Sequence, residues 1–132
     1  MADLESKEPL NIVLVDDDLN VLYVHSAYIR MLGHRVWAFT TPEAVFEFMF
    51  GHKGSVDLVI TDYRMPSVSG SELIHRIRSL GFEVPSIILT GHAHEITGLD
   101  YTKYRTSIVG KPVKIAELNH QIKSQVSNHV FV

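Results

Sequence analysis

Five polar side chains in this sequence follow short apolar runs and have the chemistry needed to handle a phosphoryl group. They are Asp16, Asp17, Asp62, Thr90 and Lys111. The three carboxylates form an oxygen-rich, negatively charged set, which suits a hard cation such as Mg²⁺. Phosphoryl transfer asks mainly for an in-line nucleophile and for cations on the oxygens. Lys111 and the Thr90 hydroxyl could therefore hold a phosphoryl group while Asp62 attacks phosphorus, which would give an acyl phosphate.

The alternation of short apolar runs with longer amphipathic segments predicts how these side chains meet. Strands are predicted over 10–15, 36–39, 56–60, 84–89 and 108–109. Helices are predicted after Asp18 up to Gly33, and over 42–51, 69–80 and 115–127, with a poorly helical segment at 92–104. This alternation indicates an α/β fold, a doubly wound five-stranded parallel sheet between helical layers. Right-handed crossovers bring the carboxyl ends of all strands to one edge, where ligands of such folds bind.

Three details refine the predicted helices. In the first one Val21, Val24, Tyr28 and Met31 recur at helical spacing. In the second, Thr41 and Pro42 form a strong start, because threonine can cap and proline is tolerated in the first turn. Further apolar residues are expected on the inner faces of the second and third helices, namely Val45, Phe48, Met49, Leu73, Ile74, Ile77 and Leu80.

The composition is that of one ordinary globular domain. The chain has 132 residues, of which 45% are hydrophobic and 20% charged, so it can bury a core. Its net charge of −3 gives no basic footprint of nucleic-acid binding, and the absence of cysteine excludes disulfides and thiolate chemistry. No signal-like or bilayer-spanning apolar run occurs. We expect a cytoplasmic protein with a polar tail at 1–9, one domain at 10–127 and a short tail at 128–132.

Four strings closely resemble the receiver domains of bacterial two-component response regulators. They are 12–18 (IVLVDDD), 56–66 (VDLVITDYRMP) with Gly70 after it, 87–91 (IILTG) and 111–112 (KP). Each string is weak alone, but all four occur in order at the expected separations. The resemblance covers roughly residues 10–127 and implies a flavodoxin-like three-layer sandwich with strand order 2-1-3-4-5. The function that it implies is a phosphorelay switch that is not an enzyme with turnover but promotes its own phosphorylation and dephosphorylation.

The same resemblance implies roles for the acidic residues. Asp62 matches the phosphoacceptor of the family. Asp17 matches a direct Mg²⁺ ligand, and Asp16 matches an acid that acts mainly through water. The backbone carbonyl of Arg64, two residues after the acceptor, matches the third protein ligand. The resemblance therefore implies Mg²⁺ as the cofactor.

It also implies the residues that contact the phosphoryl group and the partner that supplies it. Thr90 matches the hydroxyl that turns toward the phosphoryl group, and Lys111 matches the family's fixed cation. The bond between Lys111 and Pro112 matches a cis peptide, a geometry essentially confined to proline. The donor would be a phosphohistidine on a sensor histidine kinase or a histidine phosphotransfer protein, with no role for nucleic acid or membrane.

The chain departs from the family on its fifth strand. Receivers commonly have Tyr or Phe three residues before the lysine, where this chain has Ile108, whose β-branched side chain has few rotamers and cannot make the same swing. With the poor helical character of 92–104, this predicts a divergent or loosened fourth helix. Output would then use order–disorder of that segment or the face of the first or last helix. His92 and Arg64 hold positions that tend to face the reaction centre, so we expect them to tune the phosphoryl lifetime.

Simpler interpretations apply to several residues. Asp18 is expected to cap the following helix. His92 and His94 form an H-x-H pair that could suggest zinc, but no third ligand stands at an obvious spacing, so a solvated pair is favoured. A calcium EF-hand loop is excluded, because Val21 stands where the loop requires glycine and Ala27 where it requires glutamate.

Two other functional classes share part of this residue set. One is an aspartate-nucleophile phosphatase of the haloacid dehalogenase type, which also uses Asp, Thr, Lys and Mg²⁺. Asn20 stands where that class has Thr or Val, and the chain lacks length for a cap domain. The other is a pseudo-receiver that binds partners without phosphorylation, which the intact set of acids, hydroxyl and lysine disfavours.

Overall fold

The structure is a computed structural model, and it describes residues 9–52, 54–92, 96 and 105–130. Five parallel strands form one sheet in the order β3-β2-β4-β5-β6. Their bounds are β2 (Asn11–Val15), β3 (Arg35–Phe39), β4 (Leu58–Asp62), β5 (Ser86–Thr90) and β6 (Thr106–Gly110). In chain order this is 2-1-3-4-5, so the predicted fold class is confirmed.

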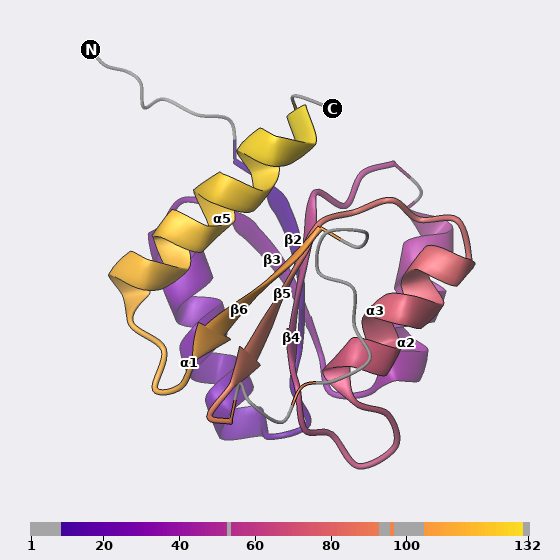
Figure 1. Cartoon of the computed structure of the whole chain (residues 1–132), viewed down its shortest axis with the longest axis horizontal. Helices are drawn as coiled ribbons and strands as arrows, with labels where there is room; N and C mark the ends of the chain where they lie inside the picture. The colour runs from indigo at the N-terminus through magenta and orange to yellow at the C-terminus, as the bar shows by residue number, and fades with distance from the viewer. Residues whose placement is uncertain (1–8, 53, 93–95, 97–104, 131–132) are drawn as a thin grey trace.

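The helices of the described residues cover both faces of the sheet (Figure 1). On one face lie α1 (Leu19–Met31) and α5 (Ile115–Val130), and on the other lie α2 (Pro42–Gly51) and α3 (Gly70–Ser79). Each layer has its own apolar core. Ile12, Leu14, Ile29, Leu118 and Ile122 belong to the first, and Val13, Val15, Val45, Leu73 and Ile77 belong to the second.

The two cores explain the uninterrupted apolar runs of the central strands. Every residue of β4 and β5 is buried, as are the last four of β2. Neighbouring side chains along a strand point to opposite faces, so the middle of a strand with helices on both sides is apolar at successive positions, while the buried polar residues of these strands lie at or near their ends.

The helix starts follow the predicted capping chemistry. The Asp18 carboxylate accepts hydrogen bonds from the backbone N–H of Asn20 and Val21, at 2.9 and 3.2 Å. The Thr41 hydroxyl accepts from Ala44 N–H at 3.2 Å, with proline at the first helical position. These bonds satisfy N–H groups that the first turn of a helix leaves without partners.

The structure corrects several details of the predicted elements. β4 begins at Leu58 rather than at residue 56, and it extends to Asp62. Leu80, predicted on the inner face of the third helix, is the C-cap of α3 and is 47% exposed. Phe48 is half-buried, whereas Val45 and Met49 are buried as predicted. The last helix continues past residue 127 to residue 130.

Of the apolar residues that recur at helical spacing in α1, Val21 and Tyr28 are half-buried, and Tyr28 packs against the core. Val24 and Met31 are 45% and 73% exposed. The buried residues of the helix are Leu22, His25, Ser26 and Ile29.

The predicted divergent helix at 92–104 lies almost entirely outside the described residues, as does His94.

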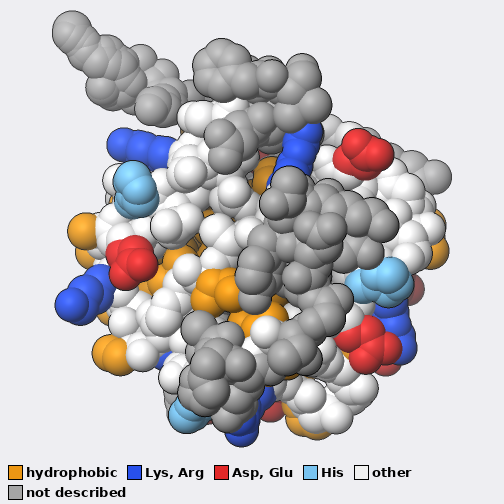
Figure 2. All heavy atoms as spheres, viewed as in Figure 1, with side chains coloured by type: hydrophobic (Ala, Val, Ile, Leu, Met, Phe, Trp, Pro, Cys, Tyr) orange, Lys and Arg blue, Asp and Glu red, His pale blue; other side chains and the backbone are white. Residues whose placement is uncertain are grey.

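On the face seen in Figure 2, Lys and Arg side chains lie apart from one another and alternate with Asp and Glu. Among the described residues, no helix has both the length and the apolar character to cross a bilayer.

Candidate functional site

Four strands deliver the predicted site residues to one edge of the sheet. Asp16 follows β2, Asp62 ends β4, Thr90 ends β5 and Lys111 follows β6. The parallel register aligns these ends, since Val15 pairs with Thr61, Asp62 with Leu89, and Thr90 with Gly110. Residues from distant parts of the sequence are thus brought together by topology.

Three carboxylates gather at this edge. Asp16, Asp17 and Asp62 each offer an oxygen within 4.8 Å of the others. Asp16 and Asp62 are only 3% and 6% exposed, whereas Asp17 is exposed. Such an all-oxygen, partly open set is what a hydrated Mg²⁺ requires, because this ion keeps several waters and takes one or two carboxylates.

Asp16 is the member of the set that most needs a cation. Its Oδ1 accepts the backbone N–H of Asp18 at 2.9 Å, but its buried Oδ2 has no hydrogen-bond partner among the described residues. Burial raises the pKa of Asp16, and the charges of Asp62 and Asp17 add to this, while the Asp18 N–H and the Lys111 cation act in the opposite direction. A divalent ion would supply the missing partner for Oδ2 and offset the repulsion.

Lys111 supplies the fixed positive charge of the site. Its Nζ donates to Asp62 Oδ1, and its backbone N–H donates to the carbonyl of Thr90 at 2.8 Å. The peptide bond to Pro112 is cis, as the sequence predicted.

The Thr90 hydroxyl lies at the end of β5 with 3% of the residue exposed. Its oxygen accepts the backbone N–H of His92 at 3.0 Å. The hydroxyl proton is then available for donation, because a hydroxyl both donates and accepts. This bond also holds His92 near the site edge.

Gly70 allows the loop after Asp62 to fold closely against α3. Its N–H donates to Tyr63 O at 2.7 Å, and a Cβ at this position would lie 2.5 Å from the backbone oxygen of Asp62. In the sequence Gly70 stands out only as part of a motif, and its close approach to the Asp62 carbonyl becomes apparent from the fold.

His25 is a neighbour of the site that the sequence analysis missed. It is buried on α1 with 7% exposed. Burial lowers the pKa of His25, the positive charge of Lys111 lowers it further, and the charge of Asp62 opposes both. The imidazole therefore lies close enough to the site to feel both charges. No motif marks this residue, because its burial depends on which face of α1 meets the sheet.

The remaining predicted residues lie around this centre. Arg64 is exposed in the loop between β4 and α3, and Pro112 is exposed after Lys111. Ile108 pairs with Ile88 across β5 and β6 and packs against the cluster that contains Ile74 and Ile88. It is thus a half-buried packing residue of β6.

Comparison with known proteins identifies the family of the chain. The family model of the response regulator receiver domain matches residues 12–123. The chain is 33% identical over 81 residues to the response regulator protein TmoT of Ectopseudomonas mendocina, covering 61% of this chain and 36% of that protein. It is 28% identical over 125 residues to the transcriptional regulatory protein RprY of Bacteroides fragilis, covering 94% of this chain and 51% of that protein. The chain therefore spans about a third to a half of these relatives.

Solved structures share the fold. A response regulator receiver domain protein from Clostridium thermocellum superposes with a TM-score of 0.83 at 24% identity, covering 92% of this chain and 98% of that one. The response regulator TrrA of Thermotoga maritima, solved with Mg²⁺ and BeF, gives a TM-score of 0.76 at 26% identity, covering 88% and 98%. Because the family model spans most of its length, the chain belongs to the response regulator receiver domain family, the phosphoacceptor switches of two-component signal transduction.

Proposed function

We propose that Asp62 is the phosphoacceptor of this receiver and that it takes its phosphoryl group from a phosphohistidine donor. The donor would be a sensor histidine kinase or a histidine phosphotransfer protein in the cytoplasm. The observation that carries the proposal is the position of the Asp62 carboxylate, which pairs with the Lys111 ammonium and has an oxygen within 4.8 Å of oxygens of Asp16 and Asp17.

The residues divide the work of the transfer. A carboxylate oxygen of Asp62 forms the new bond to phosphorus as the bond from phosphorus to the donor nitrogen breaks. Lys111 neutralises negative charge on the phosphoryl oxygens, and the Thr90 hydroxyl donates a hydrogen bond to one of them. These contacts let the protein promote its own phosphorylation and, with water as the attacking group, its own dephosphorylation.

Magnesium is the cofactor that the donor set fits. Asp16, Asp17, Asp62 and the backbone carbonyl of Arg64 would hold it. When bound, the ion supplies positive charge to the phosphoryl oxygens as charge develops on them. The similarity to TrrA, whose structure contains Mg²⁺ and BeF, supports this assignment.

Intact mass after incubation with acetyl phosphate and Mg²⁺ tests the proposal. The parent chain should gain the mass of one phosphoryl group, and this gain should vanish in Asp62→Asn and in excess EDTA. Asp18→Asn is the matched control, because asparagine caps a helix as well as aspartate, and it should be phosphorylated like the parent. Phosphorylation of Asp62→Asn to the parent's extent would overturn the assignment, and rapid turnover of small phosphoesters would favour a phosphatase instead.

Arg64 and His92 are proposed to set the lifetime of the phosphoryl group by steering or blocking the attacking water. His92 is tied to Thr90 through its backbone, and Arg64 follows Asp62 by two residues. We expect Arg64→Ala and His92→Ala to change the dephosphorylation rate several-fold while leaving the extent of phosphorylation intact. The dephosphorylation rate is measured as the loss of the phosphoryl mass after the donor is removed. Rates indistinguishable from the parent's would contradict this.

A further inference from the structure

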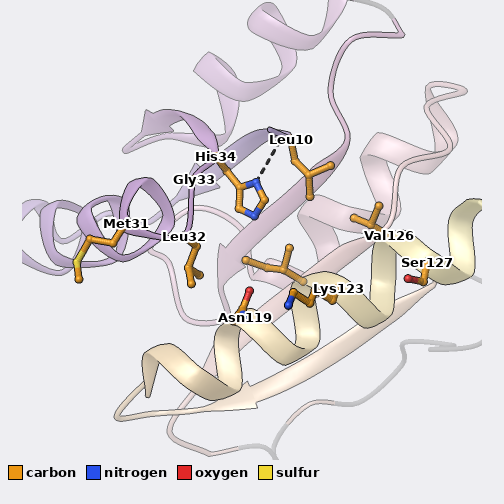
Figure 3. Close-up of a pocket in the computed structure, with 10 residues that line it drawn as sticks. Leu10, Met31, Leu32, Gly33, His34, Asn119, Lys123, Val126 and Ser127 are labelled. Carbon is orange, nitrogen blue, oxygen red and sulfur yellow. Dashed lines mark hydrogen bonds between the residues drawn. The ribbon is translucent and has the colours of Figure 1, made fainter. Parts of the chain in front are cut away.

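A cavity lies at the edge of the sheet opposite to the carboxylates. Its volume of about 880 Å³ falls within the roughly 300–1,000 Å³ of small-molecule sites. The walls come from Leu10 before β2, from the turn between α1 and β3, and from the second half of α5 (Figure 3). Because Leu10 precedes β2 whereas Asp16 follows it, the strand separates this cavity from the proposed phosphoacceptor site.

Most of the cavity wall is apolar. Ile122 of α5 is fully buried, and Leu10 and Leu32 pack against the same core. Val126 continues the surface along α5, and Met31 forms the rim with 73% of the residue exposed. An apolar body in this cavity would cover surface that water now contacts, which is the main source of affinity for such sites.

The turn that forms one wall is held by a set of backbone hydrogen bonds. Gly33, at a φ of +95°, donates its N–H to Arg30 O at 2.9 Å, and His34 donates to Ile29 O at 3.3 Å. These bonds satisfy the last carbonyls of α1. The Nδ1 atom of His34 accepts the N–H of Leu10 at 3.1 Å, which ties the turn to the start of β2 (Figure 3). The wall is therefore formed before any ligand arrives.

The polar groups of the cavity favour an anion. Asn119 and Lys123 are one turn apart on α5 and both line the cavity, so their side chains lie on the same face of the helix. None of the ten described lining residues is an Asp or a Glu, although the whole chain carries a net charge of −3. Among the described residues, Lys123 makes no ion pair. Within the described part of the chain, one ammonium and one amide thus stand beside an apolar surface without a competing carboxylate.

We propose that this cavity binds a small organic monocarboxylate with an apolar or aromatic body. The carboxylate would pair with Lys123 Nζ and accept a hydrogen bond from Asn119 Nδ2. The body would lie along Leu32 and Val126 and cover Met31. A ligand bound here would bridge α1 and α5, and it would add a small-molecule input to the receiver that is independent of phosphorylation.

Titration with 2-naphthoate and its neutral analogue 2-naphthamide tests the proposal on the full chain without Mg²⁺. Calorimetry should show that the acid binds about threefold to fivefold more tightly than the amide, since Lys123 is exposed and an exposed ion pair contributes only modestly to affinity. Backbone amide shifts should centre on Gly33, Asn119 and Lys123. Lys123→Gln should weaken naphthoate about threefold to fivefold and leave naphthamide unchanged, whereas Lys114→Gln, the same charge change outside the cavity, should have no effect.

The phosphoacceptor function is separated from this test because Asp62→Asn should bind naphthoate like the parent. The proposal fails if naphthoate does not bind, if acid and amide bind equally, or if both lysine substitutions weaken naphthoate to the same extent. Amide shifts centred on the carboxylate edge would place the anion at the phosphoryl site and would also overturn it. So would self-association that Met31→Glu abolishes, because the surface would then serve a second copy of the chain.

Discussion

Asp16 bears the largest electrostatic cost of the site in the absence of a cation. It is buried, one of its oxygens has no partner among the described residues, and two further carboxylates lie beside it. Like charges at such distances disfavour ionisation, and burial adds to the effect. The arrangement is expected to lower the stability of the metal-free protein, and a bound cation would offset this cost.

Asp62→Asn should therefore raise the melting temperature of the metal-free protein. The substitution removes the repulsion between Asp62 and Asp16 but also removes the pair with Lys111. The Lys111 side chain is 31% exposed and that of Asp62 9%, so the ammonium can turn to water after the substitution, and the loss of the pair offsets only part of the relieved repulsion. A net gain of about 1 kcal/mol would raise Tm by roughly 2–6 °C, and the further rise on adding Mg²⁺ should shrink. Calorimetric melting with EDTA and with Mg²⁺ checks both effects, and an unchanged response to Mg²⁺ would contradict the metal assignment.

His25 should make the stability of the protein sensitive to mildly acidic pH. Its pKa is lowered in the folded chain, chiefly by burial, while the unfolded chain has the ordinary value of about 6.5. Below that value the unfolded chain binds a proton that the folded chain does not. The free energy of unfolding therefore falls as pH decreases from 6.5 to the lowered pKa, by at most about 1.4 kcal/mol per unit.

Urea unfolding at pH 7.5 and pH 5.5 measures this loss. His25→Gln should lose less stability between the two pH values than the parent chain does. His120→Gln, which removes an exposed imidazole from α5, controls for the loss of one histidine. If His25→Gln and the parent lose the same free energy, the buried imidazole is not the group responsible.

Among the elements, the presence of the central strands was the easiest feature to predict, and the residues at which they begin and end were the hardest. An uninterrupted apolar run reveals a strand that is buried on both faces, but it does not reveal which residues pair. The backbone N–H of Asp57 donates to Asn11 O at 2.8 Å, and its carboxylate accepts from Asn11 N–H, also at 2.8 Å. Asp57 thus ties the segment before Leu58 to the start of β2, and β4 begins two residues later than its apolar run.

The candidate site could be predicted because it lies at strand ends. Asp16, Asp62, Thr90 and Lys111 follow apolar runs, and parallel topology alone brings such positions together. His25 could not be predicted, because the apolar residues of α1 at helical spacing include both the exposed Val24 and Met31 and the core-packed Tyr28, and so do not define one buried face. Which side packs on the sheet depends on the crossover between β2 and β3, and local sequence does not encode that.

The contact between α3 and the loop after β4 gives a prediction at the scale of elements. In Gly70→Ala the new methyl group would meet Asp62 O at 2.5 Å, so backbone must shift and overpacking costs about 1–3 kcal/mol. The expected result is a lower Tm and slower phosphorylation by acetyl phosphate, because the displaced backbone carries Asp62. Gly51→Ala is the control, since nothing lies within 4 Å of the added atom. Equal melting temperatures for Gly70→Ala and Gly51→Ala would show that the loop adapts freely.

At the scale of the molecule, one sheet connects two apolar cores. Residues of β2 alternate between them, with Ile12 and Leu14 in the core below α1 and α5, and Val13 and Val15 in the core below α2. Neither core can separate from the sheet without exposing the other. We therefore expect the described layers to unfold as one cooperative unit, as small single domains usually do.

This cooperativity predicts that Mg²⁺, bound at one edge, protects the whole sheet. A ligand that binds only the folded chain stabilises it by about 2.7 kcal/mol at one hundred times its Kd. The slowest-exchanging amides of β2, β4 and β5 exchange only through global unfolding. With Mg²⁺ at one hundred times its Kd, their hydrogen exchange should therefore slow by the same factor of about one hundred at either end of each strand. Asp62→Asn should show a smaller, equally uniform effect at the same Mg²⁺ concentration. The contrary result would be protection by Mg²⁺ only at the residues around Asp16 and Asp62, with unchanged exchange of the strand amides. The ion would then order only its own loops. Its binding at this edge would not be coupled to the stability of the two cores.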